Sequence, residues 1–323
     1  MASLYDVFIG PLSNGFQCFS SASTVAALGG CAAADAFRAT FLMMLLMSAF
    51  TFAASRVTRN DSWVDRLWSI VPVVYAWVLA VYGRPVVVWH STSVVFAALI
   101  TMWGARLTFN FHRKGGYRCG GEDYRWAHVR TWTVFQSRWV WTLFSLGFVS
   151  FFQSLVLWMI TVPVYYMDSS VPCTTTGAVI AALFVVALAF ESLCDQQQWD
   201  FQNEKRRVRG RVPSVDYDIG FRIDGTFGFS RHLNVFCEQC IWTTVFFAAA
   251  VQQRNLFHGT FLGAFLLVLI TVSSTRLTEQ LSLSKYPLYR VYQRTTPMLL
   301  PSLRYAAEFT KAHIRLAKGK RAK

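Results

Sequence analysis

Long apolar runs alternate with shorter polar segments over most of the chain. A helix that crosses a membrane needs about 20 mainly apolar residues, and seven stretches show this pattern: 37–54, 67–83, 91–104, 139–166, 177–193, 233–251 and 256–274. The second is short, and the first and sixth have irregular flanks, so six or eight spans also fit. The fourth is long enough to tilt or break near Pro163. The pattern predicts an all-α fold, a polytopic membrane helical bundle of about seven transmembrane helices.

The composition supports a membrane protein. Hydrophobic residues make up 54% of the 323 residues and charged residues only 15%, whereas soluble domains carry about 25% charged residues. The predicted organisation is an N-terminal segment (1–35), a transmembrane domain (36–301) and a basic C-terminal tail (302–323).

The basic residues are concentrated in the loops and tail on one side of the membrane that the seven predicted spans would cross. All but three of the 31 Lys and Arg residues fall on that side, the exceptions being Arg38, Arg84 and Arg254. Such an excess marks the cytoplasmic or matrix side, which places the C-terminus there. We interpret the net charge of +14 as a surface for anionic membrane lipid or a phosphate-bearing cofactor, not for nucleic acid. No signal or transit peptide is evident, and endoplasmic reticulum and mitochondrial inner membrane both fit.

Polar residues gather at the ends of spans on this basic side. Glu191 and Asp195 lie one turn apart at the end of the fifth span, and Arg231, Asn234 and Glu238 share one face at the start of the sixth. Ionisable residues at membrane depth are costly and indicate function. Because both helices border the same loop, the two polar stripes are predicted to face each other across a pocket.

The polar clusters have two interpretations. Carboxylates beside Arg206, Arg207 and Arg231 can form structural ion pairs, or they can bind ribose hydroxyls while the arginines hold phosphates. A third cluster at 275–301, which includes Tyr286, fits either interfacial anchoring or a site. The clusters alone therefore indicate a nucleotide site without requiring one.

The sequence lacks the motifs of a Rossmann domain and of a zinc site. The loop at 102–130 has two Gly pairs that permit tight turns, but no GxGxxG lies between a strand and a helix, which argues against a Rossmann domain. Cys237 and Cys240 form a CxxC inside an apolar helix, without a second pair at zinc spacing. They are predicted to pack, and no metal site is expected.

Five motifs in order carry a resemblance that covers about residues 60–301. They are DSWVDRLWSIVP, WGARLTF…R…EDYRW, ESLCDQQQWDF, SRHLNVFCE and KYPLYRVYQ. In this order the chain resembles an uncharacterised branch of steroid 5-alpha-reductase-like membrane proteins. The wider superfamily includes sterol C14 and C7 reductases and isoprenylcysteine carboxyl methyltransferases.

The resemblance implies a helical membrane enzyme whose C-terminal half holds NADPH. By position, Asp195, Asn234 and Glu238 match residues lining the cofactor cleft, and Arg231 and His232 begin an Arg-His-Pro-Asn-Tyr signature. With the neighbouring polar groups, the predicted cofactor-binding residues are Glu191, Asp195, Arg206, Arg231, His232, Asn234, Glu238, Glu279 and Tyr286. The sequence departs from the signature at three positions, which carry Leu233, Val235 and Cys237 in place of Pro, Tyr and Gly.

The expected activity is hydride transfer from NADPH to a carbon–carbon double bond of a lipid or steroid-like substrate. A proton donor must complete such a reduction, and Tyr124, Glu122 and Tyr75 are the candidates, each also explicable as structural. The altered signature supports an alternative, a non-catalytic accessory subunit of a larger membrane complex. A third interpretation, an S-adenosylmethionine-dependent methyltransferase, is disfavoured by the long ESLCDQQQ match.

Overall fold

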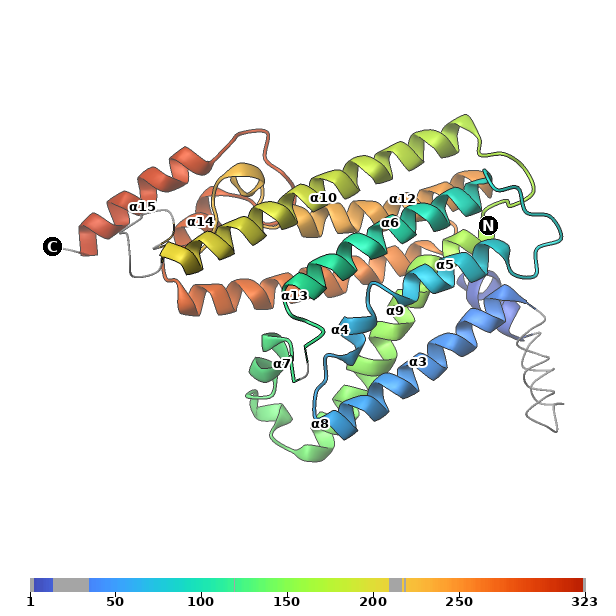
Figure 1. Cartoon of the computed structure of the whole chain (residues 1–323), viewed down its shortest axis with the longest axis horizontal. Coiled ribbons are helices and arrows are strands. Elements are labelled where there is room, and N and C mark those ends of the chain that lie inside the picture. Colours follow the sequence, from blue (N-terminus) through green and yellow to red (C-terminus); the bar gives the residue numbers. More distant parts are fainter. Residues whose placement is uncertain (1–2, 14–34, 119, 209–216, 218, 322–323) are drawn as a thin grey trace. The chain divides into compact units, whose positions relative to one another are not determined.

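The computed structural model describes residues 3–13, 35–118, 120–208, 217 and 219–321. Within these ranges the regular structure is helical, apart from a single antiparallel bridge between Ser91 and Pro172 (Figure 1). The predicted all-α class is confirmed. The α-helices are α3 (Ala36–Thr58), α4 (Trp63–Leu67), α5 (Val71–Val81), α6 (Thr92–Arg113), α7 (Tyr124–Val129), α8 (Arg138–Phe144), α9 (Gln153–Thr161), α10 (Thr175–Val208), α12 (Leu233–Gln252), α13 (Phe261–Lys285), α14 (Tyr289–Thr295) and α15 (Ala307–Arg321).

Six helical runs in the described residues are long and apolar enough to cross a membrane. They are α3, α6, the run from Arg138 to Tyr166, α10, α12 and α13. Helix α5 corresponds to the second predicted span but has 11 residues, about 16 Å at 1.5 Å per residue, half of a hydrocarbon core of about 30 Å. The protein is a multi-pass integral membrane protein.

The fourth predicted span is irregular where the sequence indicated a break. A π-helix, η3 (Ser145–Phe152), precedes α9, and a 3₁₀-helix, η4 (Val162–Tyr166), follows it. Pro163 is near the start of η4, where its missing amide hydrogen costs no helical bond. The change from α9 to η4 therefore occurs at this proline, as the sequence predicted.

The chain divides into two compact units. Unit 1 comprises Met1–Val185 and Trp242–Leu267, and unit 2 comprises Val186–Ile241 and Val268–Lys323. In unit 1, the indole of buried Trp158 donates to Thr40 Oγ1 at 3.1 Å, and the rings of Trp103 and Trp242 meet edge to face at 4.9 Å. Large aromatic side chains therefore hold the core of unit 1 together.

Unit 2 has its own hydrophobic cluster outside the membrane-spanning segments. Buried Ile219, Phe221, Ile223, Tyr289, Tyr292 and Ile314 form it. Ile314 comes from α15, and the Thr310 and Thr295 hydroxyls join α15 to α14 at 2.7 Å. The predicted basic tail therefore contains a helix that packs on the core of unit 2.

Candidate cofactor-binding site

Helix α10 brings two buried carboxylates into unit 2. Glu191 and Asp195 are 5% and 7% exposed and are separated by one helical turn, so they share a face of the helix. Burial of carboxylates is costly unless polar partners surround them. This face of α10 is therefore a polar surface inside a membrane protein, as the sequence predicted.

Arg231 and Glu279 form a buried, two-pronged ion pair. Arg231 Nε lies 2.6 Å from Glu279 Oε1 and Nη2 lies 3.0 Å from Oε2, and both side chains are less than 10% exposed. Glu279 also contacts His232 Nε2 at 3.0 Å and accepts from Gln293 Nε2 at 3.0 Å and Tyr289 Oη at 3.3 Å. One carboxylate thus joins α13, α14 and the residues before α12.

Arg231 donates from its third guanidinium nitrogen as well. Arg231 Nη1 donates to the backbone carbonyl groups of Gln293, at 3.0 Å, and of Thr296. Four of the five N–H donors of an Arg side chain are thereby used within the protein. Arg231 orders the junction of three elements and has little capacity left to hold a phosphate.

A second pair joins the end of α10 to the residue after α13. Lys205 Nζ donates to the Gly220 carbonyl at 2.7 Å and to Tyr286 Oη at 3.0 Å. Gly220 has φ +88°, and a Cβ there would lie 2.2 Å from the Tyr286 ring, so only glycine permits this contact. Burial raises the pKa of the Tyr286 phenol, but the hydrogen bond and charge of Lys205 and the charge of Lys285 outweigh it and lower the pKa.

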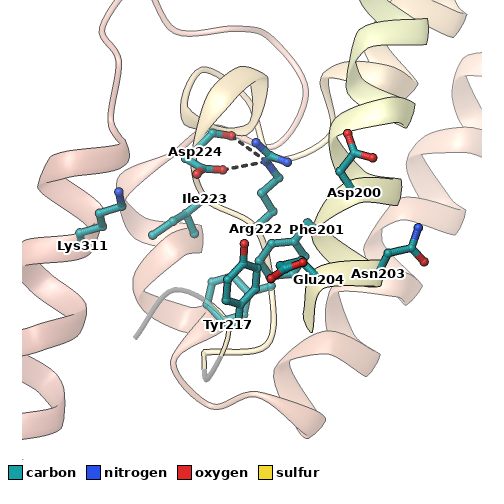
Figure 2. Close-up of a pocket in the computed structure, with 10 residues that line it drawn as sticks. Asp200, Phe201, Asn203, Glu204, Tyr217, Arg222, Ile223, Asp224 and Lys311 are labelled. Carbon is teal, nitrogen blue, oxygen red and sulfur yellow. Dashed lines mark hydrogen bonds and ion pairs between the residues drawn. The ribbon is translucent and has the colours of Figure 1, made fainter. Parts of the chain in front are cut away.

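Unit 2 also contains a cavity of about 390 Å³, whose lining residues are drawn in Figure 2. Its lining combines aromatic rings, carboxylates and two cations: Phe201, Tyr217, Phe221, Ile223, Asp200, Glu204, Asp224, Asn203, Arg222 and Lys311. The rings of Phe201 and Tyr217 lie 5.4 Å apart, tilted by 30°. Arg222 is paired with Asp224 at 2.7 Å, as Figure 2 shows. The volume lies within the range of about 300–1,000 Å³ typical of ligand pockets.

All nine residues predicted to bind a cofactor fall in unit 2. The structure brings Arg231, His232 and Glu279 into direct contact. Asn234 and Glu238 are half-buried on the first two turns of α12, and Arg206 is exposed near the end of α10. None of the predicted residues lines the cavity. Tyr286 lies next to one lining residue, because its ring centroid is 6.2 Å from that of Phe221.

The predicted proton donors belong to unit 1. Both Glu122 oxygens accept from Arg130 at 2.6 Å, and the same Arg130 reaches buried Asp61 at 2.5 Å. The hydrogen bond to Glu122 is the main reason that the pKa of Arg130 is raised. The Tyr124 side chain is 58% exposed and that of Tyr75 is buried.

Sequence reasoning missed three residues that shape this part of unit 2. Gln197 Oε1 accepts from the backbone N–H and the hydroxyl of Thr226, both at 2.9 Å. Lys205 and Arg222 were not predicted, because nothing in the surrounding sequence distinguishes them from other basic residues of the same loop and helix end, such as Arg206 and Arg207. Gln197 lies within ESLCDQQQ, so its motif was recognised, but nothing local indicated which glutamine points to the loop.

Comparison with known proteins points to one family. Residues 51–296 match the family described as "Protein of unknown function (DUF1295)". The chain is 35% identical over 273 residues to uncharacterized protein C594.04c of Schizosaccharomyces pombe, covering 81% of this chain and 78% of that protein. No solved structure gave a significant match.

Proposed function

The chain belongs to the DUF1295 family, and from this premise we propose that it is a membrane-embedded NADPH-dependent reductase. Its substrate would be a carbon–carbon double bond of a lipid or steroid-like molecule. The proposal also places the protein in the endoplasmic reticulum or mitochondrial inner membrane, with the basic C-terminus on the cytoplasmic or matrix side. The resemblance to steroid 5-alpha-reductase-like proteins supplies the reaction class.

The observation that carries the proposal is the chemistry of the unit 2 cavity. Aromatic rings such as Phe201 and Tyr217 offer faces on which a nucleobase can stack. Carboxylates such as Asp200 and Glu204 can accept from ribose hydroxyls, and the cations Arg222 and Lys311 can contact phosphates. The residues present therefore suit one end of a dinucleotide.

In such a reaction some residues would bind the cofactor and others would hold the polypeptide around it. When bound, NADPH supplies a hydride, and the protein must orient it and exclude water. The Arg231–Glu279 pair fixes the polypeptide around the site, and Lys205 orients the Tyr286 phenol. The proton donor stays a prediction from the sequence: Glu122 is held by Arg130, whereas Tyr124 is accessible.

A specific observation favours the second candidate, an accessory subunit of a membrane complex. Arg231 and His232 begin the segment that resembles the reductase signature, yet both contact Glu279. Such contacts can preserve the signature for structural reasons after a cofactor has been lost. The S-adenosylmethionine-dependent methyltransferase remains the least supported proposal.

Cofactor binding separates these candidates. The purified protein in detergent is heated with NADPH, NADH or S-adenosylmethionine, and unfolding is followed by intrinsic fluorescence. A ligand present at 100 times its dissociation constant, binding only the folded state, adds about 2.7 kcal/mol. The double variant Asp200→Asn/Glu204→Gln should lose this stabilisation, whereas Asp168→Asn, at an exposed site in unit 1, should retain it.

Each pattern of ligand stabilisation supports a different function. Stabilisation by NADPH that depends on Asp200 and Glu204 supports the reductase. Stabilisation by S-adenosylmethionine alone supports the methyltransferase. A folded protein that responds to none of the three ligands excludes both enzyme proposals and leaves the accessory subunit.

A further inference from the structure

An exposed apolar segment lies between α14 and α15. Residues 297–306, here called the C-terminal arm, include Leu300 at 70% and Leu303 at 103% relative exposure, with Tyr305 at 47%. Scattered single apolar residues on a surface are common, but these lie within six residues of one another. Phe229 contacts Tyr305 at 5.1 Å between ring centroids and is itself exposed. The arm and Phe229 thus expose four large apolar side chains on unit 2, two of which are in contact.

Hydrogen bonds fix the arm to the residues that precede a membrane span. The backbone N–H groups of Arg231 and His232 donate to the carbonyl groups of Pro297 and Met298, at 2.9 and 3.0 Å. In the opposite direction, Ser302 and Ala306 donate to residues 229 and 228, both at 2.9 Å. The arm is therefore held along residues 228–232, directly before α12 begins at Leu233.

This attachment sets the depth of the arm relative to a membrane. Helix α12 has 20 residues and is about 30 Å long at 1.5 Å per residue, which matches the hydrocarbon thickness. A helix of this length that crosses the membrane has its first residue at the boundary between acyl chains and headgroups. Exposed leucines and aromatic rings attached at that level lie where such side chains partition favourably.

The charge near the arm selects the kind of lipid. Arg304 is exposed between Leu303 and Tyr305. From residue 302 to the end of the chain there is one acidic residue, Glu308, against seven basic ones: Arg304, Lys311, Arg315, Lys318, Lys320, Arg321 and Lys323. Basic clusters beside a span attract anionic headgroups.

We propose that the C-terminal arm is a membrane-surface anchor that binds anionic phospholipids. Leu300 and Leu303 insert between headgroups, and Arg304 contacts lipid phosphate. The arm is bonded to Arg231 and His232, so the anchor also braces the Arg231–Glu279 pair. The anchor does not depend on the proposed reductase activity.

Photocrosslinking of the full chain in its native membranes tests the occupant of the arm. Leu303 is replaced by photoreactive benzoylphenylalanine, and the same replacement at Arg207, an exposed side chain of α10, is the control. Lipid adducts at position 303 and their absence at position 207 are expected. A protein adduct at position 303, or a position 303 that reacts only with water, overturns the proposal.

Nanodiscs with and without phosphatidylserine test the charge preference. Hydrogen exchange of residues 299–305 should slow when phosphatidylserine is present. The variant R304E should weaken this response about fivefold or more, because one basic residue at a membrane surface contributes about 1 kcal/mol. Exchange that is insensitive to phosphatidylserine in the wild-type protein refutes the preference for anionic lipid, whichever way NADPH binding turns out.

Discussion

Glu279→Gln is the substitution whose effect follows most directly from the structure. The change keeps the shape of the side chain but removes the charge opposite Arg231. It also replaces one acceptor oxygen by an NH₂ group among side chains that all donate to this carboxylate. Arg231 is 8% exposed and Glu279 is 5% exposed, so water cannot easily compensate either partner.

The expected loss of stability is large. Removing one partner of a buried ion pair typically costs about 3–5 kcal/mol, because the other charge stays buried without compensation. The same substitution at Glu308, whose side chain is 79% exposed and pairs with Lys311 at 3.3 Å, should change stability by less than about 1 kcal/mol. These two Glu→Gln variants differ mainly in burial.

Equilibrium unfolding in mixed micelles measures both variants against the wild type. The double variant Arg231→Met/Glu279→Met should be more stable than Glu279→Gln, because no unpaired charge remains. If Glu279→Gln is no more harmful than Glu308→Gln, the pair does not organise unit 2 as described.

Two further pairs of substitutions test other positions. In ultraviolet titration, Tyr286→Phe should remove a phenol that ionises below the ordinary pKa of about 10, and Lys205→Met should raise the pKa of the Tyr286 phenol. Because the folded-state pKa of Tyr286 is depressed, the ionised phenol stabilises the fold above pH 10. This stabilisation is lost as the pH falls through the folded-state pKa. Gly263→Ala should destabilise unit 1, because a Cβ there would lie 2.4 Å from the Met159 carbonyl, whereas Gly147→Ala, with no atom within 4 Å of the new Cβ, should be neutral or stabilising by thermal unfolding.

The spans could be predicted from the sequence because lipid imposes a simple requirement on length and polarity. Each predicted stretch contains a helix, but some boundaries differ. Helix α10 continues to Val208, well beyond the predicted end at 193, because its polar continuation contains no Gly or Pro to stop it. Helix α15 was concealed by its charges, although Ala307, Thr310 and Ile314 recur on one buried face.

The site was harder to predict because its contacts join distant parts of the chain. Glu191 and Asp195 were recognisable, since a carboxylate in an apolar helix stands out locally. The pairing of Arg231 with Glu279 spans 48 residues, and that of Lys205 with Tyr286 spans 81. No local periodicity connects such positions. The cavity lining comes from α10, from residues 217 and 221–224 and from α15, and of these residues only Asp200 and Phe201 lie within a recognised motif, ESLCDQQQWDF.

The Arg231–His232 dipeptide shows how a signature can have two physical causes. Its side chains bind Glu279, while its backbone N–H groups bind the C-terminal arm. Leu233 has a backbone N–H that Pro lacks, but it begins α12, where the first N–H groups have no partner within the helix. Leu in place of Pro at position 233 is therefore compatible with the backbone at the start of α12. We expect the altered signature to affect cofactor chemistry more than folding. This is why cofactor binding, and not stability, decides between a reductase and an accessory subunit.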